Sequence, residues 1–104
     1  MEFEKFKEIR ELLCLKHPEV TEGKMMSSPA IHYNNKVFAF FSRKYRMVFK
    51  LGKDHSLEEY DFELSEFSPF KTKKPLVGWY EVDFEYRDKW ETLTLKALES
   101  IKLN

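Results

Sequence analysis

The chain is poor in several residue types on which particular folds and reactions depend. Its 104 residues include one cysteine, three glycines and four prolines, and eighteen basic residues balance eighteen acidic ones. A lone Cys14 excludes an internal disulfide. The widely separated glycines, Gly23, Gly52 and Gly78, exclude a glycine-rich loop that binds phosphate. A net charge of zero excludes the positive field over the whole molecule that is typical of generic nucleic-acid binders.

Long apolar runs and a charged-apolar-small leader are also missing from the sequence. We therefore expect no membrane partner and a soluble, reducing, cytoplasmic setting. Apolar residues nevertheless make up 42% of the chain, with ten Phe, five Tyr and two Trp. That content is enough for one hydrophobic core, and the length is typical of one domain, so residues 1–104 are expected to form a single domain.

Amphipathic helices are expected at both ends of the chain. The N-terminal one carries apolar residues at helical spacing, namely Phe3, Phe6, Ile9 and Leu13. Pro18 should end it near Lys16 or His17, because proline disfavours helical geometry in the residue before it. The C-terminal one shows the same spacing at Trp90, Leu93, Ala97 and Ile101. Asp83 and Asp88 are both suitable residues for its start.

The aromatic middle of the chain predicts a three-stranded antiparallel meander. Asn34-Asn35 tolerates the left-handed backbone of a tight hairpin turn, and the segment from Ser42 to Tyr45 is a second candidate reversal. Two-residue loops at both reversals would place Ile31 opposite Phe38, Phe38 opposite Phe49, and Phe40 opposite Met47. These residues would form the core face, packed under the helices.

The same registers give the second face of the meander a mixed character. It would carry His32, Val37, Ala39, Phe41, Arg46, Val48 and Lys50. A face exposed to water is normally polar, so its apolar members indicate cover by another element or another subunit. Val37, Phe41 and Val48 are therefore the candidate interface residues.

The segment after Gly52 completes the expected fold. The spacing of Ser56 and Glu59 matches a capping box and predicts a short helix. Two further strands are expected, from Phe67 to Phe70 and from Leu76 to Val82, joined by a lysine-bearing turn. The expected class is α+β: an antiparallel sheet of about five strands packed against N-terminal and C-terminal helices, with the short helix between the third and fourth strands.

No catalytic or metal-binding motif is present. Cys14 and His17 lie three residues apart on a helix, but a zinc site needs about three or four ligands, and only His32 and His55 remain as nitrogen donors. Ser27 and Ser28 lack a recognisable base and suit a turn. The acidic residues Glu58, Glu59, Asp61, Glu63 and Glu66 match no calcium loop and suit a solvated face. We expect no catalytic residues, no metal and no cofactor.

Basic residues give the main functional indication. The candidate nucleic-acid contacts are Lys36, Arg43, Lys44, Arg46, Lys50, Lys73 and Lys74. If the hairpin tips converge, these residues would form a wing-like basic edge, with Phe41 and Tyr45 available for contact. The alternative is that the lysines protect exposed strands from aggregation.

The sequence also resembles a known family. The run PEVTEGKMMSSPAIHYNNKVFAFFSRKYRMVFKL, followed by PF, a turn, a WYEV strand and a final helix beginning near Trp90, is similar to the N-terminal domain of TfoX-type competence regulators. More broadly, it resembles the YjbR and MmcQ-like group of small α+β proteins. Family members commonly have a methionine, an aromatic residue and paired glycines where this chain has Met25, Met26, Ser27 and Ser28.

The resemblance implies a cytoplasmic bacterial domain that acts through binding rather than catalysis. The absence of catalytic motifs and the mixed second face of the meander further lead us to expect a homodimer or a chain that binds a protein partner, with a link to transcriptional regulation. The alternative is nucleic-acid binding through a double-winged surface, which has been suggested for YjbR-like proteins. A small-ligand binder or an enzyme is the third class, and it would require a deep apolar pocket with convergent polar groups.

Overall fold

The computed structural model describes residues 1–25, 27–52, 60, 62, 64–68 and 76–103. The elements are α1 (Glu2–Lys16), β1 (Val20–Met25), β2 (Ser28–Tyr33), β3 (Lys36–Phe41), β4 (Met47–Lys50), β5 (Ser65–Glu66), β6 (Trp79–Val82), a 3-10 helix (Phe84–Tyr86) and α2 (Arg87–Lys102). The expected α+β class is confirmed, with six strands rather than about five. The short helix expected at Ser56 falls on residues 53–59, outside the described part.

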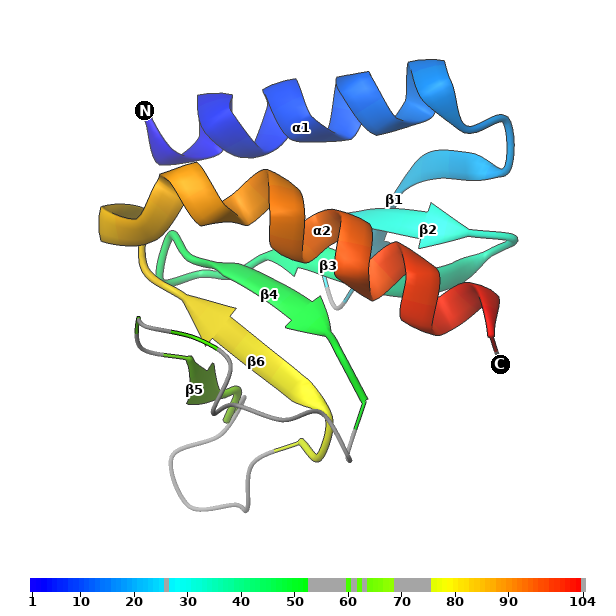
Figure 1. Ribbon diagram of the computed structural model, residues 1–104. Helices are drawn as coiled ribbons and strands as arrows, with labels where there is room; N and C mark the ends of the chain where they lie inside the picture. Colours follow the sequence, from blue (N-terminus) through cyan, green and yellow to red (C-terminus); the bar gives the residue numbers. More distant parts are fainter. Residues whose placement is uncertain (26, 53–59, 61, 63, 69–75, 104) are drawn as a thin grey trace.

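The six strands form one antiparallel sheet in the order β1-β2-β3-β4-β6-β5. Both helices lie on one face of this sheet, α2 across the central strands and α1 beside it (Figure 1). The main core fills the space between the helices and the sheet. β1 and β5 form the two outer edges, and β5 is only two residues long.

α1 ends where the sequence predicts, and α2 starts between the two candidate residues Asp83 and Asp88. α1 ends at Lys16, and His17 is extended before Pro18. Phe6, Ile9 and Leu13 are buried, whereas Phe3 lies at the margin of the core and is 40% exposed. Asp83 begins the 3-10 helix rather than α2 itself, because its carboxylate accepts a hydrogen bond from the Glu85 N–H at 3.0 Å. α2 then starts at Arg87.

The two hairpin turns differ in length, and this changes one register. Asn34 and Asn35 both have positive φ, 48° and 68°, so the predicted tight turn is confirmed. The loop between β3 and β4 has three residues, 43–45, and ends in Tyr45 with φ 63°. A three-residue hairpin loop ends in a left-handed residue of this kind. The expected two-residue loop is therefore wrong, and Phe41 rather than Phe40 lies opposite Met47.

A bulge in β3 reverses the faces of the residues that follow it. Ile31 pairs with Ala39, whereas its neighbour His32 pairs with Val37, so Phe38 is an extra residue in β3. One extra residue shifts the alternation of side chains by one position. Phe41 and Ala39 therefore join the main core beneath the helices. The expectation that they lie on the second face is wrong, and Phe40 takes that position.

The second face has its own small core. Ala30, Phe40 and Val48 are buried there. The Phe67 ring packs edge-on against Phe40, with a centroid distance of 5.2 Å, and the Trp79 ring lies 5.6 Å from Phe40. Phe67 continues the β5–β6 pairing, since its N–H donates to the Trp79 carbonyl. Phe67 and Trp79 of the same chain therefore cover part of the apolar second face.

Candidate interaction surfaces

The loop between β3 and β4 is organised by hydrogen bonds to Ser42. Its buried hydroxyl accepts hydrogen bonds from the N–H groups of Lys44 and Arg46, at 3.2 and 3.3 Å. Its own N–H donates to the Arg46 carbonyl at 2.8 Å. The turn therefore holds Arg43, Lys44 and Tyr45 at the surface, where the Tyr45 side chain is 63% exposed.

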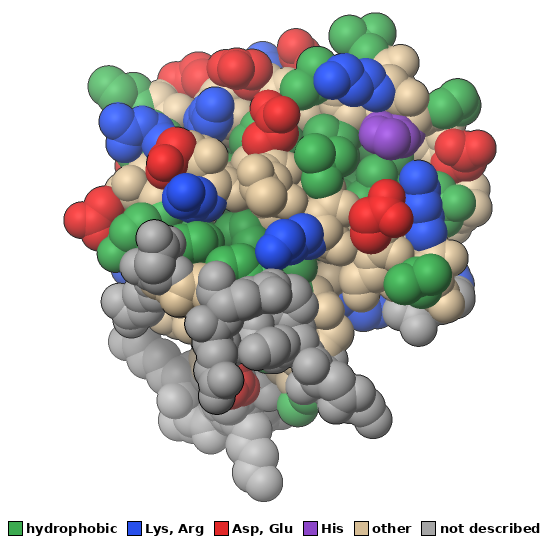
Figure 2. All heavy atoms as spheres, in the orientation of Figure 1, with side chains coloured by type: hydrophobic (Ala, Val, Ile, Leu, Met, Phe, Trp, Pro, Cys, Tyr) green, Lys and Arg blue, Asp and Glu red, His purple; other side chains and the backbone are tan. Residues whose placement is uncertain are grey.

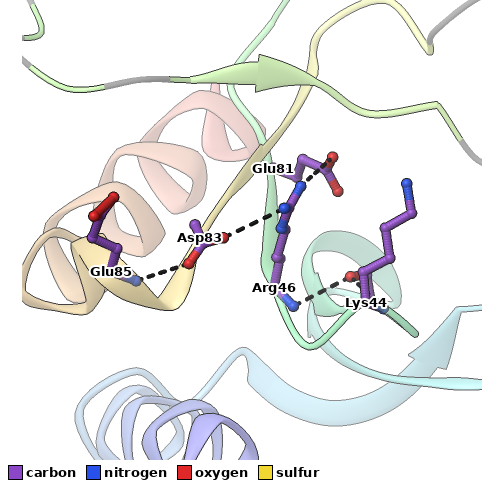
Figure 3. Close-up of polar contacts among 6 residues, drawn as sticks. Lys44, Arg46, Glu81, Asp83 and Glu85 are labelled. Carbon is purple, nitrogen blue, oxygen red and sulfur yellow. Dashed lines mark hydrogen bonds and ion pairs between the residues drawn. The ribbon is translucent and has the colours of Figure 1, made fainter.

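Arg46, which follows Tyr45, forms ion pairs with two acidic residues of the same chain. Its guanidinium Nη1 lies 3.2 Å from Glu81 Oε1 and its Nη2 lies 3.4 Å from Asp83 Oδ2 (Figure 3). Glu81 lies in β6, which pairs with β4, and Asp83 directly follows β6. Two carboxylates thus neutralise the positive charge of Arg46. The guanidinium is a weaker candidate for binding phosphate than its place in the sequence suggests.

A small polar hollow adjoins this ion-pair cluster. It has a volume of about 120 Å³ and is lined by Arg46, Ser65, Glu81, Asp83, Glu85 and Tyr86. Pockets for drug-sized ligands are larger, roughly 300–1,000 Å³, and mostly apolar. The described residues around it therefore do not form the deep apolar pocket that the small-ligand class requires.

The other predicted basic residues do not gather at this turn. Lys36 begins β3 and the Arg43–Lys44 turn follows its end, so the two lie about 17 Å apart along the strand. Lys50 lies at the far end of β4, with its Nζ 5.8 Å from the centroid of the Trp79 ring. Lys73 and Lys74 lie outside the described residues. The described candidates therefore do not form one continuous basic edge.

Charges of both signs are mixed on the face that carries α2. Figure 2 shows Lys and Arg side chains interspersed with Asp and Glu side chains there, with apolar groups between them. A surface of this kind produces no extended positive potential. It is a typical solvated surface rather than a nucleic-acid interface.

Two of the three candidate interface residues are buried within the chain. Phe41 is 6% exposed and packs against both Phe3 and Phe6, with centroid distances of 5.6 and 5.5 Å. Val48 is fully buried in the second-face core. Only Val37 is partly exposed. These residues therefore do not offer an exposed apolar patch to another subunit.

The outer strand β1 is the surface that sequence reasoning missed. Its residues, VTEGKM, lack the apolar alternation that marks a half-buried strand, and Thr21, Glu22 and Lys24 are exposed. In the described part of the chain, its central residues pair only with β2. Arg10 of α1 lies over it, with Nη2 3.3 Å from Glu22 Oε1. The sequence feature that could have indicated this strand is its position: it lies between Pro18, which ends α1, and β2, with which it pairs.

Gly23 at the middle of β1 allows close packing with β2. A Cβ atom on Gly23 would lie 2.2 Å from His32 Nε2, a distance that side chains do not tolerate. The His32 imidazole therefore occupies the space above the glycine, and its buried Nε2 has no hydrogen-bond partner among the described residues. Glycine serves here for close approach, not for a turn.

The single cysteine lies near the same strand. Partial burial raises the pKa of the Cys14 thiol, and the Glu22 carboxylate raises it further. In the part of the chain that the structure describes, no three His, Cys, Asp or Glu side chains are grouped to hold a metal ion. Cys14 therefore has the environment of an unreactive thiol.

Comparison with known proteins adds no relative. No family model matches the chain, and neither the curated proteins nor the solved structures contain a match. Within the described residues, neither helix has the length and apolar character needed to cross a membrane.

Proposed function

We propose that this chain is a non-enzymatic interaction module of the bacterial cytoplasm, as its resemblance to TfoX N-terminal domains implies. In this proposal it binds another polypeptide that adds a strand to the sheet beside β1. The supporting observation is that β1 is a six-residue outer strand without proline whose central residues pair, among the described residues, only with β2.

Strand addition uses backbone groups that every outer strand has. Successive residues of a strand direct their N–H and C=O groups alternately to the two sides, so half of β1 points away from β2. Such an edge is a ready template for an extended peptide. The opposite edge is a poorer template, because β5 has only two residues.

Lys24 is the residue at which this proposal can be tested. It lies opposite Pro29, which has no N–H, so the pair cannot exchange two hydrogen bonds. Lys24 is therefore expected to direct its own N–H to the outer side. Lys24→Pro should remove that donor and leave the β1–β2 pairing intact, whereas Lys24→Ala removes the charged side chain and keeps the backbone N–H.

The experiment selects extended peptides from a displayed random library on the immobilised protein. Selected peptides should lose binding to Lys24→Pro by about tenfold or more and should bind Lys24→Ala within about threefold of the unchanged chain. Circular dichroism would confirm that both variants fold. Recovery of no peptide, or equal binding to both variants, would reject strand addition at β1.

Nucleic-acid binding is the second candidate, and the turn after β3 favours it. That turn displays two cations, Arg43 and Lys44, beside an exposed aromatic ring, as single-strand binders do. Tyr45 also holds a left-handed conformation that costs an aromatic residue about 1 kcal/mol. A side chain kept at such a cost is a reasonable candidate for contact with a base.

Tyr45→Gly separates binding from stability in this second candidate. Glycine adopts positive φ without strain, which offsets the loss of the ring contact with Phe41. The free energy of unfolding of the variant should therefore stay within about 1 kcal/mol of that of the unchanged chain. If the ring stacks on a base, the variant should lose affinity for labelled single-stranded DNA at low salt. Duplex DNA titrated at low and physiological salt completes the test, and absence of a salt-dependent complex rejects the candidate.

A further inference from the structure

We propose that the polypeptide that pairs with β1 is a second copy of this chain. The two copies lie antiparallel about a two-fold axis beside Gly23, so that Glu22 of each copy faces Lys24 of the other. This inference rests on the proposed function, because it names the partner for the same edge. It adds a specific register, and the charges on the strand select that register.

The geometry of antiparallel pairing leaves few registers to consider. A residue that points its N–H and C=O to the partner must lie opposite another residue that does the same. In a symmetric pair, the two-fold axis must therefore pass beside one residue, which lies opposite its own copy. An axis at Glu22 or Gly23 keeps five of the six residues of β1 paired, whereas an axis at Thr21 or Lys24 keeps only three.

Charge then separates the axis at Gly23 from the axes at Glu22 and Lys24. An axis at Glu22 places two carboxylates opposite each other, and an axis at Lys24 does the same with two ammonium groups. Like charges directly opposite are destabilising in a sheet, whereas opposite charges stabilise it. The axis at Gly23 brings Glu22 opposite Lys24 twice, so it replaces a repulsive contact with two attractive ones.

The side chains concerned are available for this pairing. Glu22 and Lys24 are both exposed and lie on the same face of β1, because they are two residues apart. Arg10 contacts one oxygen of the Glu22 carboxylate, and that side chain is still 63% exposed. Gly23 itself adds no side chain at the axis, where the two backbones approach most closely.

Charge reversal tests the register with variants of the full chain. Lys24→Glu or Glu22→Lys alone would place like charges opposite each other at both sites, so self-association measured by sedimentation should weaken about tenfold. The double variant Glu22→Lys/Lys24→Glu restores opposite charges, and its affinity should return to within about threefold of the unchanged chain. A mixture of the two single variants should form heterodimers in preference to homodimers.

Two controls show whether weaker self-association results from this register or from another effect of the substitutions. Glu22→Lys also removes the partner of Arg10, so urea unfolding of each variant would show whether the chain itself is weakened. Lys44→Glu reverses a charge at the β3–β4 turn and should leave self-association unchanged.

The results distinguish failure of this inference from failure of the proposed function. The inference of a second copy as partner is overturned if the chain stays monomeric at its highest soluble concentration. It is also overturned if neither Lys24→Glu nor Glu22→Lys weakens the dimer. If peptides selected on the protein still lose binding to Lys24→Pro, strand addition stands with a different partner. If they do not, the proposed function fails as well.

Discussion

Arg46 and Glu81 form an ion pair in which the acid is the more buried member. The Glu81 side chain is 9% exposed and that of Arg46 is 37% exposed. Arg46 contacts Glu81 Oε1, and the buried Oε2 has no hydrogen-bond partner among the described residues. Removing the guanidinium would leave a buried carboxylate without a compensating charge, which costs more than the pair itself contributes. The main energetic effect of this ion pair is therefore that it prevents the buried Glu81 carboxylate from being left without a cation.

We predict that Arg46→Ala lowers the free energy of unfolding by about 2 kcal/mol. Lys44→Ala, which removes an exposed cation from the same turn, should change it by less than about 0.5 kcal/mol. Urea denaturation followed by circular dichroism measures both. The double variant Arg46→Ala/Glu81→Ala should cost less than the sum of the two single changes, and strict additivity would contradict the pairing.

Gly23→Ala should destabilise the chain although alanine is a small residue. The added Cβ would meet His32 Nε2 at 2.2 Å, so the imidazole at the end of that side chain must rotate away, at a cost of about 1 kcal/mol. Introducing His32→Ala into the Gly23→Ala chain should recover part of that loss. Thermal unfolding of the two single variants and the double variant measures this coupling. No recovery would show that the two sites do not clash.

Phe41 and Val48 should behave as core residues in mutagenesis. Phe41→Ala should cost about 3–5 kcal/mol, because it removes contacts with both Phe3 and Phe6. Val37→Ser, at the partly exposed position, should cost much less. Chemical denaturation checks the order of these effects. If Phe41→Ala left stability unchanged, the placement of this ring beneath α1 would be wrong.

The reactivity of Cys14 should be low and should depend on Glu22. A raised pKa means less thiolate at a given pH, so alkylation by iodoacetamide at pH 8 should be slower in the folded chain than in urea. Glu22→Gln removes one cause of the shift and should speed the reaction. Because the unfolded thiol loses its proton first, stability should fall as pH rises beyond about 8.5. Stability that rises there would contradict the direction of the shift.

Much of the helical structure could be predicted because helical spacing depends only on the local sequence. Phe6, Ile9 and Leu13 define the buried side of α1, and Pro18 sets its end. The Asn34-Asn35 turn was equally local, since asparagine tolerates positive φ. These features needed no knowledge of the rest of the chain.

The sequence did not predict which β3 side chains lie on each face of the sheet. That assignment depends on the number of residues in the β3–β4 loop and on whether β3 contains a bulge. A loop of three residues instead of two shifts the pairing with β4, and the bulge at Phe38 shifts the alternation within β3 itself. Neither feature has a glycine to mark it. Phe40 and Phe41 are adjacent and identical in type, so composition could not separate their roles.

The surfaces were harder to predict than the fold, because charge pairing depends on strands distant in sequence. Nothing near Arg46 in the chain indicates that Glu81 and Asp83 will neutralise it, since they are brought there by the β4–β6 pairing. The edge strand β1 was missed for the opposite reason. Its polar residues suit an outer strand, but they lack the apolar alternation by which strands are predicted from sequence.

The strand order also determines how quickly the fold can form. β1 to β4 are neighbours in both sequence and space, joined by short loops, so most of the sheet assembles from local hairpins. Low sequence separation between contacts favours fast folding. α2 packs on β2, β3 and β4 from the far end of the chain, so its docking carries the largest loop-closure entropy. Variants of Trp90 or Leu93 should therefore affect the unfolding rate more than the folding rate.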